Sequence, residues 1–215
     1  MSAPVNTQQQ QGTRKLDCGS LALRASAGFT LLELLVTLLL IAILASMAGP
    51  SFIGMIDRNR QASALGDMFG VLATARSEAV NQQTTVSTCP SSDQATCNSN
   101  NWEDGWLIFV DDGAGTGGVA DDGELNGDEE LVRIGDEAGG TLTIRSRNFG
   151  AADSISFDDD GMATDRGTLV FCSNGEVGTS SAIILNFSGQ ARLAGDDDGN
   201  GTLDEDDGSE ISTCP

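Results

Sequence analysis

The chain has 215 residues and combines 11 Lys or Arg with 32 Asp or Glu, which gives a formal net charge of −21 at pH 7. This length allows one domain, or one domain with a membrane anchor. The charge argues against nucleic-acid binding, which depends largely on neutralisation of phosphates by Lys and Arg. The lack of His excludes catalysis by a histidine base.

The first 27 residues are polar, include Arg14, Lys15 and Arg24, and show no periodicity. They predict a disordered leader. A long apolar run follows: from Leu34 to Ile56 the chain has 23 consecutive residues without a charge, enough to cross a bilayer as a helix. One carboxylate, Glu33, stands at the front of this run. A charge inside a membrane segment is costly and indicates a function, although the helix dipole also favours an acid in a first turn.

An ordinary secretory signal is the alternative interpretation of this region. The basic residues of the leader would form its n-region, and Ser46-Met47-Ala48 would serve as its small-residue cleavage site. Such signals have an apolar core of about 7–15 residues. Because the run here is longer and holds a glutamate, we favour an anchor that is retained.

The segment Gly28-Phe29-Thr30-Leu31, with Glu33 and the apolar run in register, closely resembles the class III signal of type IV pilins and pseudopilins. The resemblance implies that a prepilin peptidase cleaves between Gly28 and Phe29 and methylates the new amino group of Phe29. It also implies that Glu33 guides assembly, and that the protein enters a filament from the bacterial inner membrane. The expected parts are a leader at 1–28, a transmembrane and assembly helix at 29–56, and a periplasmic domain at 57–215.

Gly49-Pro50 and Gly54 fall inside this expected helix. Proline removes a backbone hydrogen bond, so we expect an interruption or a kink there. By the resemblance to pilins, Pro50 marks the place where the helix loosens during filament assembly.

From Arg58 the chain predicts an amphipathic helix that ends near Asn81. Its apolar residues recur at three- and four-residue steps, as in a helix with one buried stripe; they are Leu65, Met68, Phe69, Leu72, Ala75 and Ala79.

Beyond this helix the chain is Gly-rich and predicts short strands joined by long loops. The expected strands are Thr84–Thr88, Trp106–Val110, Glu130–Ile134, Thr141–Arg145, Ser154–Phe157, Thr168–Cys172, Ala182–Phe187 and Ala191–Leu193. Trp106–Val110 is continuously apolar, which is typical of a strand buried on both faces. We expect an α+β fold, the pilin fold: a long N-terminal helix, half transmembrane and half amphipathic, packed on a small antiparallel β-sheet domain.

The five cysteines fit removal of the leader. Cys18 lies in the leader, and Cys89, Cys97, Cys172 and Cys214 remain as an even set that an oxidising periplasm can pair. Zinc is the alternative, but Cys-x7-Cys lacks the usual close ligand spacing. Spacing alone leaves three connectivities open. The resemblance to pilins implies the pairs Cys89–Cys97 and Cys172–Cys214.

Among pilin-like proteins, the chain resembles the GspH/FimT branch. The segments that carry the likeness are Leu72–Val80, Val86–Ser91, Gly105–Phe109, Asp122–Glu124 and Thr168–Cys172. This implies a minor type IV pilin, a structural subunit at or near the filament tip that supports assembly, or the matching minor pseudopilin of type II secretion. The implied partners are the prepilin peptidase and other minor and major pilins or pseudopilins.

A DNA-binding minor pilin for natural transformation is a further alternative. In one arm of the branch a Gly-Arg-x-Arg motif contacts DNA, but here the place holds Gly189-Gln190-Ala191-Arg192, and Asp196–Asp198 follow. The missing arginine and the acidity disfavour DNA uptake. An enzyme is disfavoured too, because the chain has no Gly-x-Ser-x-Gly elbow and no phosphate loop ending in Lys-Ser or Lys-Thr. We expect no required cofactor.

The acidic tail carries one candidate calcium site. Counted from Asp196, the loop places Asp198 and Asn200 third and fifth, Gly201 sixth, the Thr202 carbonyl seventh, Asp204 ninth and Asp207 twelfth. This spacing resembles EF-hand-type loops and the Asp-rich repeats of thrombospondin-like proteins. Two features depart from that pattern: Asp207 is shorter than the usual chelating Glu, and no exit helix follows. The alternative is a solvated acidic loop without an ion.

Overall fold

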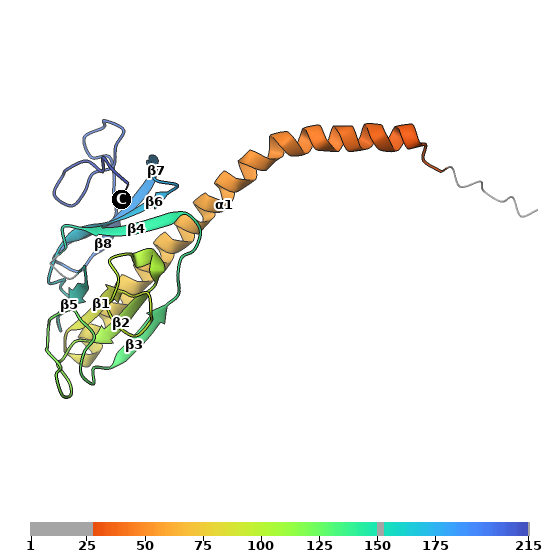
Figure 1. Cartoon of the computed structure of the whole chain (residues 1–215). Coiled ribbons are helices and arrows are strands. Elements are labelled where there is room, and N and C mark those ends of the chain that lie inside the picture. Colours follow the sequence, from red (N-terminus) through yellow and green to blue (C-terminus); the bar gives the residue numbers. More distant parts are fainter. Residues whose placement is uncertain (1–27, 150–152, 215) are drawn as a thin grey trace, which may run out of the picture. The chain divides into compact units, whose positions relative to one another are not determined.

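The residues that the structure describes form one long helix, one short 3-10 helix and eight strands (Figure 1). The computed structural model describes residues 28–149 and 153–214, without the side chains of 47–53. Apart from Gly28, the expected leader lies outside the described residues. The elements are α1 (Leu31–Gln82), β1 (Val86–Pro90), η1 (Trp102–Asp104), β2 (Trp106–Val110), β3 (Leu131–Gly135), β4 (Leu142–Arg147), β5 (Ile155–Phe157), β6 (Gly167–Ser173), β7 (Glu176–Leu185) and β8 (Ala191–Leu193).

The chain divides into two units, Met1–Ser46 and Met47–Pro215. The first unit holds the beginning of α1, and the second holds the remainder of α1 and all the strands. α1 is helical without a break over its 52 residues. Of the two outcomes expected at Gly49-Pro50 and Gly54, an interruption or a kink, the interruption is therefore not observed. A proline removes one hydrogen bond, and the turns on both sides of Pro50 still supply theirs.

The strands form two four-stranded antiparallel sheets, which confirms the predicted small antiparallel β-sheet domain. One sheet has the order β3-β2-β1-β5 and the other β4-β6-β7-β8. β7 begins at Glu176, six residues before the expected start at Ala182. A tight turn at Asn174-Gly175, both with positive φ, joins β6 to this earlier start. Such turns match the right-handed twist of paired strands.

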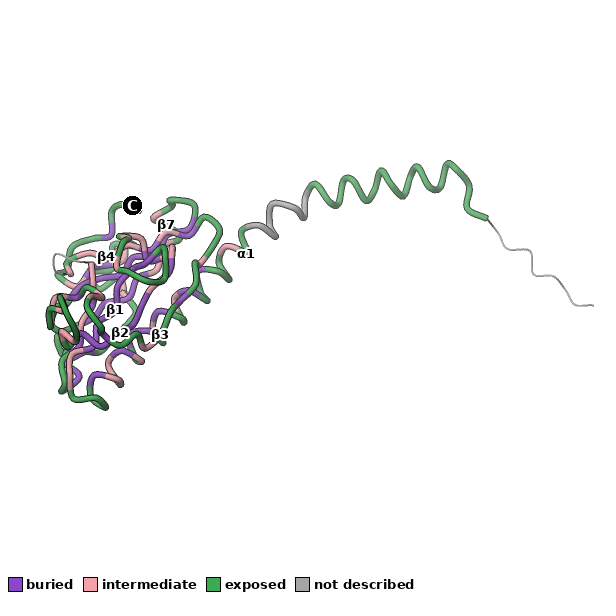
Figure 2. The backbone as a smooth tube through the Cα atoms, turned by 60° about the horizontal axis from the view of Figure 1, so that its bottom comes forward, coloured by how far each residue is buried: buried purple, intermediate pink, exposed green. Residues whose placement is uncertain are grey.

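The core lies between α1 and the inner faces of both sheets. The helix contributes one buried stripe, and Figure 2 shows this alternation of buried and exposed residues along the second half of α1. Leu65 and Phe69, expected in the stripe, are only half-buried, whereas Ala64 and Val71 are buried in their place. Residues from both sheets complete the cluster, among them Val86, Ile108, Val110, Ile144, Phe157, Leu169, Phe171, Ile183 and Leu185.

Loops cover the outer faces of both sheets and create two smaller apolar clusters. Over β6, Val170 and Cys172 pack with Ile211 of the tail. Over β2, Leu107 and Phe109 pack beside the Cys89–Cys97 loop. The expectation that Trp106–Val110 is buried on both faces is confirmed for Leu107–Val110, and β6 is also buried along its whole length.

One buried polar side chain ties α1 to the second sheet. The Gln61 Nε2 amide donates to the carbonyl of Phe171 at 3.2 Å, the carbonyl of Thr179 at 2.9 Å and the hydroxyl of Ser181 at 3.2 Å. Buried polar groups are stable only when they are paired. Gln61 therefore fixes which turn of α1 faces β6 and β7.

Candidate assembly and binding sites

The N-terminus of α1 is defined by a local cap. Gly28 and Phe29 precede the helix and are exposed, and the Thr30 hydroxyl oxygen accepts a hydrogen bond from the N–H of Glu33 at 3.2 Å. Thr is a favoured capping residue because it satisfies a free N–H group of the first turn. The cap places the Glu33 carboxylate in the first turn, where the helix dipole stabilises it. The expected cleavage bond is thus immediately before a capped helix.

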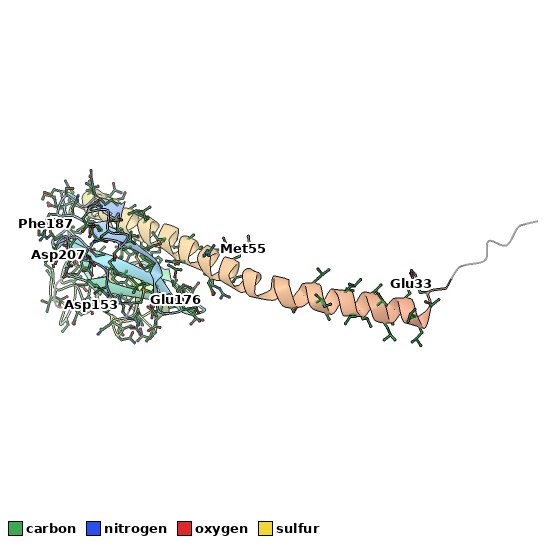
Figure 3. The ribbon with its side chains drawn as sticks, turned by 90° about the horizontal axis from the view of Figure 1, so that it is seen from above. Glu33, Met55, Asp153, Glu176, Phe187 and Asp207 are labelled. Atoms are coloured by element: carbon green, nitrogen blue, oxygen red, sulfur yellow. A yellow bond between two sulfur atoms is a disulfide. The ribbon has the colours of Figure 1, made fainter. Side chains whose placement is uncertain are left out.

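The first part of α1 is apolar on every side. Phe29 is 83% exposed, and the helical side chains up to Leu44 stand free in the first unit (Figure 3). Helices of this kind are typically surrounded by other helices or by lipid. In the part of the chain that the structure describes, no helix has the combined length and apolarity that a membrane crossing needs. Pro50 and the rest of 47–53 lie outside the described side chains.

The four expected cysteines form two disulfides. Cys89 is bonded to Cys97 and Cys172 to Cys214, with Cα–Cα distances of 5.6 and 5.8 Å. This is the pairing that the pilin resemblance implied, and it leaves none of the four as a free thiolate for zinc. Cys18 lies outside the described residues.

Polar contacts hold the tail against the second sheet. The Arg147 guanidinium pairs with the Glu205 carboxylate at 2.6 Å and donates to the Thr213 carbonyl at 2.7 Å. The Asn148 amide donates to Asp206 at 2.8 Å, and the Thr168 hydroxyl also contacts that carboxylate. Both ends of the segment 205–214 are therefore fixed, by these contacts and by the Cys214 disulfide.

Three of the six expected calcium ligands come together in this tail. Carboxylate oxygens of Asp196, Asp198 and Asp204 lie within 4.8 Å of one another. The backbone N–H groups of Gly201, Gly199 and Asn200 point at Asp196 and hold the pKa of that carboxyl below its ordinary value. Asp204 is buried and accepts the N–H of Asp197 at 2.7 Å. The loop thus brings three carboxyl groups close together.

The other three expected ligands, Asn200, Thr202 and Asp207, make different contacts. The Asn200 side chain bonds Asp198 and, at 2.8 Å, the Glu210 carboxylate. Asp207 is outside the group, and its Oδ1 instead accepts the N–H and the hydroxyl of Ser209. Thr202 donates its N–H to Asn200. Sequence spacing missed Glu210, which reaches the loop because Asp204 and Glu210 form an antiparallel bridge.

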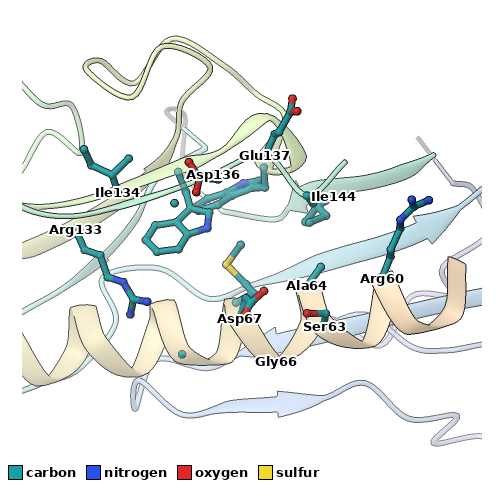
Figure 4. A pocket seen from close by; sticks show the side chains of 16 residues that line it. Arg60, Ser63, Ala64, Gly66, Asp67, Arg133, Ile134, Asp136, Glu137 and Ile144 are labelled. Atoms are coloured by element: carbon teal, nitrogen blue, oxygen red, sulfur yellow. The ribbon is translucent and has the colours of Figure 1, made fainter. Parts of the chain in front are cut away.

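Two grooves flank α1. The first, with a volume of about 490 Å³, lies between α1 and β3 (Figure 4). There the Arg133 guanidinium packs over the Trp106 ring at 5.6 Å, and Asp136 accepts from Gln94 at 3.0 Å. The indole N–H of Trp102 is buried there without an acceptor among the described residues. The second groove, of about 640 Å³, lies between α1 and the turn that joins β7 to β8.

Comparison with known proteins identifies the family. A family model described as type II transport protein GspH matches residues 64–189, more than half of the chain. The chain belongs to this family. A second model, the prokaryotic N-terminal methylation motif, matches residues 23–49, which include Gly28, Phe29 and Glu33. The GspH match ends before residue 196, so the acidic loop lies beyond it.

Solved structures of similar shape are minor pilins and pseudopilins. The type IV minor pilin FimU of Pseudomonas aeruginosa is 22% identical, with a TM-score of 0.49 over 64% of this chain and 90% of its own. The minor pseudopilin EpsH of the Vibrio cholerae type 2 secretion system is 12% identical, with a TM-score of 0.43 over 62% and 95%. No curated protein matches. These two structures are named as a minor pilin and a minor pseudopilin.

Proposed function

We propose that this GspH-family protein is a minor type IV pilin, a structural subunit at or near the filament tip that supports pilus assembly. The observation that carries the proposal is the apolar first part of α1, exposed on every side and overlapping the methylation motif. Such a helix needs lipid or other helices around it. Before assembly, the inner membrane would supply the lipid, with the 57–215 domain in the periplasm. After assembly, the filament core would supply the other helices.

Processing would occur between Gly28 and Phe29, with methylation of the Phe29 amino group by the prepilin peptidase. Both residues are exposed and precede the helix, so a peptidase can reach the bond. Glu33 would then lie in apolar surroundings inside the filament. An unpaired buried charge is costly, so its carboxylate needs a cation, which the N-terminal ammonium of an adjacent subunit provides.

The test compares wild type with two variants in the native host from which the chromosomal copy has been deleted. Glu33→Ala removes the carboxylate, and Thr37→Ala is the control, because the Thr37 hydroxyl bonds only the Leu34 carbonyl of its own helix. Mass spectrometry of the mature N-terminus and immunoblotting of sheared filaments are the measurements. We expect cleavage in all three proteins and a large drop in filament incorporation only for Glu33→Ala.

Two outcomes would contradict the proposal. A mature protein that begins at Gly49 would show an ordinary secretory signal, and normal incorporation of Glu33→Ala would remove the assembly role. Immunogold labelling tests the position at or near the filament tip, since label along the whole filament would exclude it.

A minor pseudopilin of type II secretion is the second candidate, because the family model is described as type II transport protein GspH. The two disulfides and the long acidic loops favour the pilus. Neighbouring genes decide between them: minor pilins with pilus biogenesis factors support the first, and a secretion operon supports the second. A DNA-binding role remains disfavoured, since Gln190 stands where the DNA-binding motif has arginine.

We also propose that the tail binds calcium, although a pilin requires no cofactor for the assembly role. Support comes from the spacing of the loop and from the approach of Asp196, Asp198 and Asp204. Calcium takes six to eight oxygen ligands. Asn200 and the Thr202 carbonyl would add to these three, and the Asn200–Glu210 contact makes Glu210 a better closing ligand than Asp207.

Titration calorimetry and thermal unfolding of the full chain in detergent test this site, with calcium chloride and magnesium chloride as probes. We expect binding at millimolar calcium or below and a rise in melting temperature, both lost in Asp196→Ala and Asp198→Ala. Asp159→Ala, an exposed aspartate in another turn, is the control. Glu210→Gln should weaken binding more than Asp207→Asn. Absence of heat at millimolar calcium would refute the site.

A further inference from the structure

The groove between α1 and the β7–β8 turn, here called the helix–hairpin groove, has unusual chemistry for this chain. Its volume is about 640 Å³, and one of its residues is charged, Arg76. By contrast, the groove beside β3 is lined by three carboxylates. The lining residues of the helix–hairpin groove are Phe69, Leu72, Ala73, Arg76, Ser77, Val80, Asn81, Gly189, Gln190 and Ala191.

Large apolar side chains gather around this groove and remain uncovered. Val80 lines it and is 48% exposed, and Phe69 beside it is half-buried. Met162 and Phe187 are exposed to a similar extent and adjoin the groove. The N–H of Ala163 bonds the Phe187 carbonyl at 3.1 Å, and Gly161 packs against Val80 and Arg76. Contiguous exposed apolar surface on an otherwise polar protein marks an interaction site.

Arg76 gives the groove a positive charge that is not neutralised within the described residues. Its Nε donates to the Gly161 carbonyl at 2.9 Å, which fixes the side chain. Arg60, Arg145, Arg147, Arg166 and Arg192 each have a carboxylate within 4.0 Å, whereas Arg76, like Arg58 and Arg133, has none among the described residues. The remaining N–H groups of the guanidinium form a planar fork that suits a carboxylate.

We propose that the helix–hairpin groove receives a segment of a neighbouring filament subunit that presents an apolar side chain next to a carboxylate. The inference rests on the proposed function, and charge complementarity identifies the occupant. A chain with a net charge of −21 repels an acidic neighbour over most of its surface. At this groove a carboxylate meets Arg76, while the apolar side chain covers Val80, one turn away on α1.

The acidic turn Asp158–Asp160 sets the orientation of this segment. It precedes Gly161, and burial, followed by the carboxylates of Asp160, Asp121 and Asp159, raises the pKa of the Asp158 carboxyl. A carboxylate of the neighbour placed over this turn would be repelled. The carboxylate therefore lies at the Arg76 side of the groove.

The test measures incorporation of the full chain into sheared filaments of the native host. Val80→Glu places a carboxylate in the groove, and Val119→Glu is the matched control, since Val119 is a loop valine that is 55% exposed. We expect Val80→Glu to lower the filament-bound fraction about tenfold or more, because it removes the apolar contact and because its carboxylate, four residues from Arg76 on the same helix, pairs with the cation that the neighbour's carboxylate would meet. Val119→Glu should stay within about twofold of wild type, with thermal unfolding of both variants unchanged.

The role of the cation is tested separately. Arg76→Gln should lower incorporation, and Arg76→Lys should restore part of it by keeping the charge without the fork. A photoreactive benzophenone side chain at Ser77 should cross-link to a pilin peptide that contains Asp or Glu, and the same group at exposed Ser92 should not.

The results distinguish this inference from the proposed function. Absence of wild type from filaments refutes the proposed function, and with it the filament neighbour. Wild type present in filaments with normal incorporation of Val80→Glu refutes the groove alone. A cross-link from Ser77 to nucleic acid, or to a peptide without acidic residues, also overturns the proposed occupant.

Discussion

Loss of the Cys172–Cys214 disulfide should destabilise the protein more than loss of Cys89–Cys97. The first bond joins residues 42 apart and the second joins residues 8 apart. Cross-linking removes conformational entropy from the unfolded chain in proportion to the logarithm of the loop length, which gives about 4 kcal/mol for the longer loop and about 2.5 kcal/mol for the shorter one.

The two pairs are matched in their surroundings. Cys89 and Cys172 are both fully buried, and Cys97 and Cys214 each pack at the edge of a small apolar cluster. Replacing both cysteines of a pair by alanine therefore removes similar packing in both cases. The difference in free energy of unfolding between the two variants then reflects the difference in loop length. We expect about 1.5 kcal/mol between the two variants, or about 3–6 °C in melting temperature.

Urea unfolding of the full chain in detergent provides the assay, with fluorescence of the buried Trp102 as the signal. Equal losses, or a larger loss for the Cys89–Cys97 variant, would refute the entropic argument. Hydrogen exchange adds a second measurement. If the tail 195–214 alone loses protection while the urea midpoint is unchanged, the longer bond secures the tail locally and does not stabilise the whole domain.

Three further predictions concern single side chains. Gln61→Leu should lower the free energy of unfolding by about 1–3 kcal/mol, measured in urea, because it removes the hydrogen bonds from the buried Gln61 amide to the carbonyls of Phe171 and Thr179. The N–H groups of Ala95 and Thr96 lower the pKa of Asp93 to about 2. The ionised carboxylate therefore stabilises the folded state above pH 3.8, and this contribution is lost as the pH falls toward 2. Asp93→Asn should remove this part of the acid unfolding curve. Burial raises the pKa of Glu129 above 4.5. At pH values between 4.5 and this raised pKa, the folded state binds more protons than the unfolded state, so the free energy of unfolding should rise as the pH falls toward 4.5. Glu129→Gln should abolish this rise. A pH profile identical to wild type in either carboxylate variant would contradict its assignment.

The helix was predictable because its signals are local. Apolar periodicity located the stripe around Met68 and Leu72, and Thr30 with Glu33 stands where the helix begins. Pro50 misled the prediction of a break, since its cost is local and the surrounding turns of a long helix persist. The role of Glu33 stays a prediction, because its expected partner belongs to another subunit.

The strands were less predictable where tertiary pairing outweighs composition. The first half of β7, Glu176 to Ser181, has little apolar character and is extended because the turn at Asn174-Gly175 pairs it back to β6. That dipeptide is a hairpin signal available in the sequence. Glu210 was not predictable by spacing, since it approaches the acidic loop through a bridge to Asp204 beyond the loop itself.

The two disulfides explain how so acidic a chain buries strands on both faces. Each sheet has one face against α1 and would expose Leu107 and Phe109, or Val170, on the other. The tail to Cys214, which covers Val170, is rich in carboxylates that repel one another, whereas the Cys89–Cys97 loop beside Leu107 and Phe109 holds one, Asp93. Apolar contacts of few residues, such as Ile211, oppose that repulsion only when the segment is held in place. The covalent bonds and Arg147 hold it, so the negative charge is carried on the outer loops while the buried stripe of α1 and the inner faces of the sheets stay apolar.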